Sequence, residues 1–266
     1  MKLAYKNQIP VAAHRGNSKY FPENTLIAFQ SAIEMKADMV EIDLHMTADD
    51  VLILMHDHKV DRTTNGTGLI REKTFAEMRA LDAGYSDKFG DKYKGTLVPT
   101  FEEFLELFKD QPDMLFNIEL KDYPADMGDR AYYSADCAIA LMDKYGITER
   151  SVINTWSGEL NERLVYKYGN RIKIHAYSPQ ELMGKNQKRF VHDYAYCVCF
   201  FGVSEKPVVG KNFFDLAKKY GVEPWVYFGK DTPELTDEAL EKGAMLFTSN
   251  DPQWLMDYLR EKGLHE

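Results

Sequence analysis

Short apolar runs alternate along the chain with longer segments in which apolar residues recur at helical spacing. After the first run, Leu26, Phe29 and Ile33 occupy positions i, i+3 and i+7, which places them on one face of a helix. Eight runs open such strand–helix units, and they contain Val11, Val40, Leu115, Val152, Ile172, Cys197, Trp225 and Leu246. Eight units in succession predict an α/β fold, a closed (β/α)8 TIM barrel in which residues 1–266 form a single domain. An open, doubly wound sheet is the alternative.

The helical segments carry start signals of their own. Residues 100–110 begin with Thr100, and Glu103 three positions later completes the pattern of a capping box at a helix N-terminus. A helix is also expected in the fifth unit, over residues 179–189.

Residues 57–97 interrupt the alternation. They follow "VLILMHD" (residues 51–57), a second strand-like run directly after the second barrel strand. Insertions in barrels belong in the loops above the carboxyl ends of the strands, so we expect a small cap at this position. Phe75, Met78 and Leu81 recur at about helical spacing, which favours an ordered cap over a disordered surface loop.

Charge and composition narrow the function classes. The formal net charge is −9, and an acidic chain without clustered Lys and Arg is not expected to bind nucleic acid or an anionic membrane. A small anionic substrate stays compatible, since a few local cations or a metal ion can outweigh the net charge. The three cysteines form no disulfide framework, and the absence of a signal peptide or a long apolar span predicts a cytoplasmic protein without stable membrane association.

Polar residues alternate with apolar ones in two of the predicted strands. In "MVEIDLH", Glu41, Asp43 and His45 share one strand face, and in "FNIELK", Glu119 and Lys121 do the same. Carboxylates that converge inside a barrel repel each other strongly unless a cation lies between them. Three carboxylates with room for water suit a hard divalent ion, so the sequence predicts one Mg²⁺ or Ca²⁺.

Two histidines and two cations accompany these carboxylates. His14 ends the first strand and His56 ends the "VLILM" run, and imidazoles that titrate near neutrality form a plausible general acid–base pair. Arg15 and Lys121 add positive charge suited to phosphate oxygens. A metal ion, two cations and two histidines together favour cleavage of a phosphodiester.

Other residues near this site have less specific interpretations. Gly16 should let the chain leave the first strand in a turn, and Asn24 is expected to cap the first helix. Two interpretations are open for Glu23: it stabilises the start of the helix electrostatically, or it holds residues of the site in place. His45 is expected to have no role in the chemistry.

The motifs "HRGNSKYFPENT", "EIDLHMTADDVLILMHD", "DRTTNGTG", "VPTFEEFL" and "IELK" together resemble the glycerophosphodiester phosphodiesterase family. They cover residues 12–121 closely, and "PWVYF" and "FTSNDP" are weaker matches. The resemblance implies a TIM barrel with a cap after the second strand and hydrolysis of glycerophosphodiesters to glycerol 3-phosphate and an alcohol. It assigns an acid–base pair (His14 and His56), phosphate ligands (Arg15 and Lys121) and metal ligands (Glu41, Asp43 and Glu119).

The same resemblance implies a mechanism by analogy with phosphoinositide phospholipases. The glycerol 2-hydroxyl would attack phosphorus, and water would then open the resulting cyclic phosphate. An alternative enzymatic function is a phospholipase-type activity on lipids or lysolipids. A non-enzymatic alternative is a catalytically inactive barrel that only binds a metal ion or phosphate. The head group, the native ion and the existence of a homodimer stay open.

Aromatic residues of the sixth and seventh predicted strands depart from the family pattern. Phe200, Phe201, Tyr227 and Phe228 could form an aromatic wall beside the substrate, but core packing is the favoured reading for them. Trp225 is expected to contact substrate instead.

Overall fold

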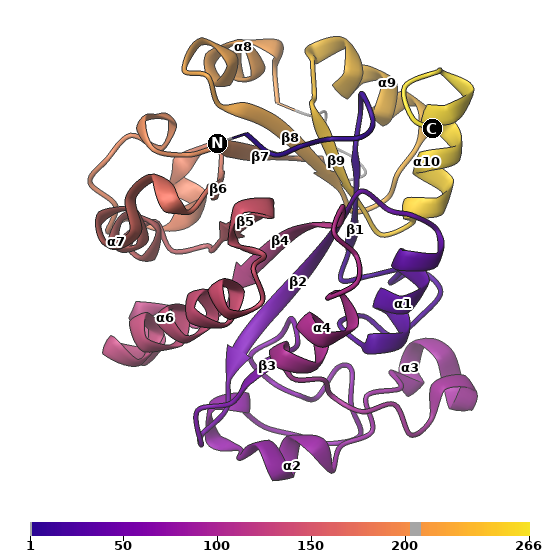
Figure 1. Ribbon diagram of the computed structural model, residues 1–266, viewed down its shortest axis with the longest axis vertical. Coiled ribbons are helices and arrows are strands. Elements are labelled where there is room, and N and C mark those ends of the chain that lie inside the picture. Colours follow the sequence, from indigo (N-terminus) through magenta and orange to yellow (C-terminus); the bar gives the residue numbers. More distant parts are fainter. Residues whose placement is uncertain (1, 203–208) are drawn as a thin grey trace.

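Eight parallel strands form a closed barrel in the computed structural model, which describes residues 2–202 and 209–266 (Figure 1). The barrel strands are β1 (Val11–His14), β2 (Met39–Met46), β4 (Leu115–Leu120), β5 (Ser151–Asn154), β6 (Ile174–Tyr177), β7 (Cys197–Gly202), β8 (Glu223–Phe228) and β9 (Leu246–Ser249). Since β1 pairs in parallel with both β2 and β9, the sheet has no open edge between its first and last strands. The predicted TIM barrel is confirmed and the open sheet is excluded.

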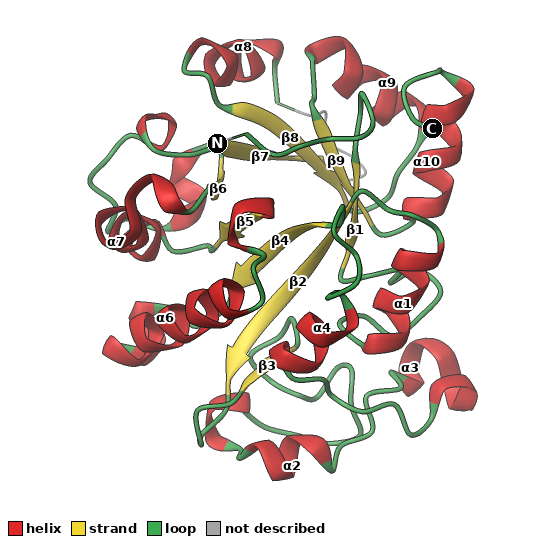
Figure 2. Ribbon diagram, viewed as in Figure 1, coloured by secondary structure: helices red, strands yellow, loops and turns green. Residues whose placement is uncertain are grey.

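Helices surround the barrel on its outside (Figure 2). They are α1 (Leu26–Glu34), α4 (Phe101–Leu107), α5 (Pro124–Met127), α6 (Asp129–Lys144), α7 (Gly158–Tyr168), α8 (Lys211–Lys219), α9 (Pro233–Lys242) and α10 (Pro252–Glu261). The predicted capping box starts α4, where the Thr100 hydroxyl accepts the Glu103 N–H and the Glu103 carboxylate accepts the Thr100 N–H. Within the described residues, no helix combines the length and the apolar character that a membrane crossing needs.

The fifth unit differs from the prediction. In place of a helix over residues 179–189, the chain forms a short 3₁₀ turn, η5 (Gln180–Met183), and later a second one, η6 (Val191–Asp193). Gly184 ends the first turn with a φ of 87°, and residues 184–189 are polar. Because most helices are stabilised by packing an apolar face, this segment has little to hold a longer helix.

The cap (residues 57–97) is ordered. It follows β3 (Leu52–Leu54), which pairs antiparallel with β2 and is not a barrel strand. The cap contains η1 (Ile70–Glu72), α2 (Phe75–Arg79), α3 (Ser86–Phe89) and η2 (Gly90–Tyr93). Val60, Ile70 and Met78 are buried in a small apolar cluster with Ile53 of β3, so a disordered loop does not describe this segment.

Side-chain alternation along the strands separates two environments. Outward-facing residues such as Ile42 and Ile118 pack against the helices in the main core. Inward-facing residues close the amino end of the barrel with an apolar floor formed by Leu3, Ala12, Met39, Leu115, Val152, Cys197, Trp225 and Leu246. Polar inward-facing residues follow further along the same strands, toward their carboxyl ends, and these build the candidate site.

Candidate active site

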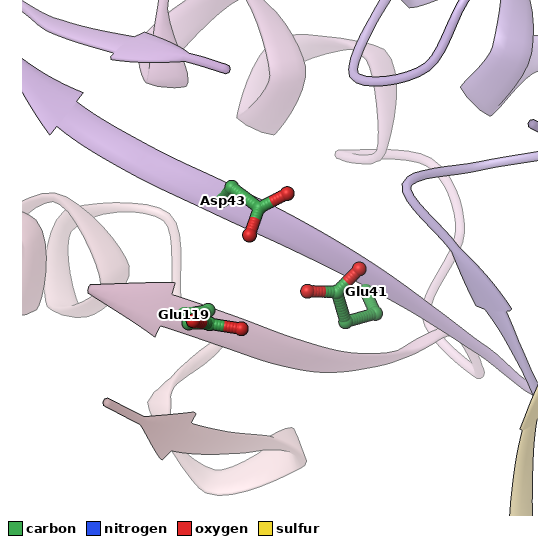
Figure 3. Close-up of side chains that lie close together, drawn as sticks. All are labelled: Glu41, Asp43 and Glu119. Carbon is green, nitrogen blue, oxygen red and sulfur yellow. The ribbon is translucent and has the colours of Figure 1, made fainter. Parts of the chain in front are cut away.

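Three carboxylates meet inside the barrel, on β2 and β4. Asp43 lies directly opposite Glu119 in the parallel register, and Glu41 lies two residues earlier on β2 (Figure 3). One oxygen from each lies within 4.8 Å of the others, and all three side chains are buried. Strand alternation predicted that Glu41 and Asp43 share a face, because residues two apart on a strand do so, and the pairing of β2 with β4 brings Glu119 to that face.

The electrostatics of this cluster fit a bound cation. Burial, then the charges of Asp43 and Glu119, raise the pKa of Glu41 well above its ordinary value. Asp43 Oδ1 is buried and accepts no hydrogen bond from the described residues, although the Lys121 ammonium forms an ion pair with it. Clustered carboxylate oxygens are the donor set of a hard divalent cation, so Glu41, Asp43 and Glu119 could hold one.

Two cations lie against the carboxylates. Lys121 Nζ approaches Asp43 Oδ1 at 3.1 Å and pairs more closely with Glu119, and Arg15 Nε lies 3.3 Å from Asp43 Oδ2. Burial alone would raise the pKa of Asp43, but Lys121 and Arg15 outweigh it and hold that pKa well below its usual range. Three carboxylates and two cations leave one negative charge, so a divalent ion would make this group net positive and attractive to a phosphodiester.

The turn after β1 is tightly constrained. Arg15 has a φ of 57° and Gly16 a φ of 80°, the left-handed region that side chains rarely adopt. A Cβ on Gly16 would lie 2.8 Å from the Ala28 carbonyl carbon of α1, so glycine is required for this close approach. The Arg15 N–H at this turn donates to the Glu41 carbonyl at 3.0 Å and to Glu41 Oε2 at 2.9 Å.

His14 is oriented by a neighbouring loop. Asn250 donates its amide to the carbonyl of Gly229 (3.2 Å), which fixes Asn250 Oδ1 as the acceptor of the His14 Nδ1–H at 2.6 Å. His14 Nε2 is then free of its proton and lies 3.8 Å from Glu41 Oε2. Burial, with help from Arg15, lowers the pKa of His14 to about 3, so this ring is neutral at neutral pH.

His56 is held from the cap side. Its Nδ1–H donates to Asp57 Oδ1 at 2.6 Å, which leaves Nε2 without a partner among the described residues. Both histidines line one cavity of about 180 Å³ together with Arg15, Glu119 and Lys121. A larger hollow of about 470 Å³ adjoins this cavity and shares His14, Arg15 and Tyr227 with it.

Asn24 has a different position from the one predicted. Thr25 caps α1, while Asn24 has a φ of 56° and turns its side chain into the barrel. Its amide donates to Asp43 Oδ2 at 2.7 Å, and its Oδ1 accepts the Asp43 N–H at 3.2 Å. Asn24 therefore orients a candidate metal ligand. Glu23 bonds to Arg15 at 2.8 Å, in agreement with the reading that it supports the site.

An aromatic wall is present, with partly different members. Trp156 stacks on Tyr177 with ring centres 4.0 Å apart, and Phe201 lies 5.3 Å from Trp156. These three rings and Tyr227 line the 180 Å³ cavity. The neighbouring residues on the strands, Phe200 and Phe228, face the helices and belong to the main core, in agreement with core packing.

Trp225 is not brought to the cavity. It faces into the barrel but lies one layer lower, in the apolar floor, with no exposed surface. Its Nε1–H donates to Glu223 Oε2 at 3.1 Å. The prediction that Trp225 contacts substrate is therefore wrong, because its depth along the strand removes it from the mouth. Tyr227, two residues later on β8, occupies the position that Trp225 was expected to take.

Sequence reasoning assigned no role to several residues that contact the site. Asn250 and Arg62 lie within motifs that support the resemblance, "FTSNDP" and "DRTTNGTG", and that was the available signal for them. His175 lines the cavity with an unpartnered Nε2, and no signal in the sequence distinguished it from a core histidine. His45 bonds to Asp122 at 3.2 Å and does not line this cavity, which suits a bystander.

Known proteins share this architecture. The glycerophosphodiester phosphodiesterase of Caldanaerobacter subterraneus subsp. tengcongensis is 32% identical in sequence over 95% of this chain and 98% of its own. A putative glycerophosphoryl diester phosphodiesterase from Silicibacter pomeroyi superposes with a TM-score of 0.83, at 21% identity, over 99% of this chain and 97% of its own.

A phosphodiesterase from Oleispira antarctica, whose structure contains the product sn-glycerol-3-phosphate, superposes with a TM-score of 0.77 at 22% identity, over 94% of this chain and 96% of its own. At these identities the two structures establish the fold. The model of the glycerophosphoryl diester phosphodiesterase family matches residues 14–253, a span that contains every residue of the site described above. The chain belongs to the glycerophosphoryl diester phosphodiesterase family.

Proposed function

We propose that this protein hydrolyses glycerophosphodiesters to glycerol 3-phosphate and an alcohol. The observation that carries the proposal is the meeting of three buried carboxylates and two cations with two differently held histidines around one cavity. Family membership and the product named in the Oleispira structure support the same substrate class.

The cations would hold the phosphate group. Arg15 and Lys121 line the cavity beside the carboxylates, and a guanidinium and an ammonium can both donate to phosphate oxygens. A divalent cation held by Glu41, Asp43 and Glu119 would supply further stabilisation of negative charge on those oxygens.

The two histidines would share the proton transfers. Neutral His14 accepts the proton of the glycerol 2-hydroxyl at Nε2 while the hydroxyl oxygen bonds to phosphorus. The bond from phosphorus to the alcohol breaks, and His56 delivers a proton to the departing oxygen. Water then opens the cyclic phosphate with the roles reversed: His56 takes a proton from water, and His14 returns its proton to the 2-oxygen.

The aromatic wall would enclose the glycerol group. A cavity of about 180 Å³ offers room for a small polar molecule of this size, and the rings of Trp156, Tyr177 and Phe201 exclude water from one side of it.

The test measures release of glycerol 3-phosphate from glycerophosphocholine, glycerophosphoethanolamine and glycerophosphoglycerol, with Mg²⁺, with Ca²⁺ and with a chelator. We expect release that depends on the metal ion. His14→Ala and His56→Ala should each lower kcat by a factor of about 10² or more. Full activity of either variant, or full activity of the wild type in chelator, would contradict the proposal.

A further inference from the structure

Arg62, in the cap, bridges two carboxylates that each reach the candidate active site. Its Nε and Nη2 donate to Asp57 at 2.7 and 3.0 Å. Its Nη1 and Nη2 donate to Glu23 at 2.9 and 2.7 Å. One guanidinium therefore makes two bidentate contacts, the geometry in which Arg binds carboxylates most specifically.

Each carboxylate also contacts a residue of the site. Asp57 Oδ1, which accepts from Arg62, accepts the Nδ1–H of His56 at 2.6 Å. Glu23 Oε1, which accepts from Arg62, accepts from Arg15 Nη1 at 2.8 Å. The two branches thus run from Arg62 through Asp57 to His56 and from Arg62 through Glu23 to Arg15.

This network differs from an ordinary surface ion pair. The Glu23 side chain is only 10% exposed, and Arg62 is 35% exposed. Tyr85 of the cap holds Arg62 in place, since its hydroxyl oxygen accepts from Nη1 at 3.2 Å and its ring lies 5.4 Å from the guanidinium. Although burial would raise the pKa of Glu23, Arg62 and Arg15 lower it to about 2, so this carboxylate stays charged.

Arg62 does not line the 180 Å³ cavity, so it does not touch a substrate there. We propose that Arg62 is a positioning residue that sets the orientation of His56 through Asp57 and of Arg15 through Glu23, and so couples the placement of the cap to both proton transfer and phosphate binding. The proposal rests on the function proposed above, because it takes its two readouts from those roles.

The two branches can be separated by experiment. Asp57→Ala removes the His56 branch and should lower kcat about 10²-fold, with the inhibition constant of glycerol 3-phosphate changed by less than about threefold. Glu23→Gln weakens the Arg15 branch and should raise that inhibition constant about 10-fold. Arg62→Ala should produce both effects together.

Conservative and matched variants complete the design. Arg62→Lys keeps the charge but cannot bond two carboxylates in bidentate fashion, so it should recover only part of the lost kcat. Arg79→Ala is the control: Arg79 also joins the cap to a neighbouring element, α4, through Glu103 at 2.6 Å, and is similarly exposed at 28%. It should leave kcat and the inhibition constant within about twofold of the wild type.

Two results would overturn the inference: an Arg62→Ala variant that is less stable but kinetically unchanged, or an Arg79→Ala variant that reproduces its kinetic losses. If the folded wild type hydrolyses no glycerophosphodiester, the proposed function fails instead. In that case the Arg15 branch is tested by calorimetric binding of glycerol 3-phosphate, since Glu23→Gln and Arg62→Ala should each still lower the affinity for it about 10-fold. Equal affinities in the wild type and both variants would refute that branch.

Discussion

Glu41 and Asp43 should respond in opposite directions when their charge is removed in the metal-free protein. Glu41 has a raised pKa, so its ionised form is disfavoured in the folded state. Its contribution to stability is therefore lost as the pH rises above the ordinary pKa of a glutamate. Asp43 has a lowered pKa, so its ionised form stabilises the fold above the pKa of the unfolded chain. At pH 8 in chelator, Glu41→Gln should therefore stabilise the protein and Asp43→Asn should destabilise it.

The magnitude follows from the spacing of the carboxylates. Two unit charges 4.8 Å apart, the limit of the oxygen separations in this cluster, repel by about 3 kcal/mol at an effective dielectric constant of about 20. Glu41 faces two such neighbours, and Arg15 and Lys121 offset part of the repulsion. We therefore expect a gain of about 1–2 kcal/mol in the free energy of unfolding for Glu41→Gln and a loss of about 2–3 kcal/mol for Asp43→Asn, which leaves two cations short of a partner.

The assay is urea unfolding of the wild type and both variants, first in chelator and then with a divalent ion. A ligand present at about 100 times its dissociation constant stabilises the folded state by about 2.7 kcal/mol. The wild type should gain this increment, whereas both variants should gain much less and lose at least about 10³-fold in kcat/KM. Glu234→Gln, a change at the exposed start of α9, should alter neither quantity.

The reasoning is refuted if Glu41→Gln and Asp43→Asn shift stability in the same direction in chelator. It is also refuted if either variant gains as much from the ion as the wild type does. The first outcome would mean that repulsion does not dominate at Glu41, and the second that these carboxylates do not hold the ion.

Two further predictions concern stability alone. Burial raises the pKa of Asp231 to about 6, so the wild type should lose stability as pH rises from about 4 through 6. The Asp231→Asn variant can still accept the Ser249 hydrogen bond and should be more stable than the wild type by about 2 kcal/mol at pH 8 but not at pH 4. A stability difference in urea unfolding that does not change with pH would contradict this prediction. Phe104→Ala removes a fully buried ring and should lower the free energy of unfolding by about 3–5 kcal/mol in the same assay. Tyr166→Ala, at a side chain that is 89% exposed, should lower it by less than about 0.5 kcal/mol, and equal losses would show that burial is not the cause.

Local sequence signals predicted those features that depend on a few neighbouring residues. The period of two along a strand placed Glu41, Asp43 and Glu119 on inward faces, and the barrel then brought them together. The capping box at Thr100 started a helix where it was expected.

Depth within the barrel was decided by the tertiary structure. Trp225 and Tyr227 share one face of β8, but Trp225 lies in the apolar floor and Tyr227 lines the cavity. The stagger between neighbouring strands of a closed barrel sets how far each residue lies along the axis, and the alternation of a single strand contains no information about that stagger.

Contacts between distant segments were likewise invisible in the sequence. Asn24 looked like a helix cap because Asn commonly takes that position, yet the adjacent Thr25 caps α1 and Asn24 bonds to Asp43 on β2. Arg62 joins Glu23, 39 residues away, only because the cap folds back over the turn after β1. Short-range periodicity and capping thus determined the elements and the faces of their side chains, whereas strand stagger and long-range ion pairs, which depend on where the elements meet in space, determined which of those side chains form the site.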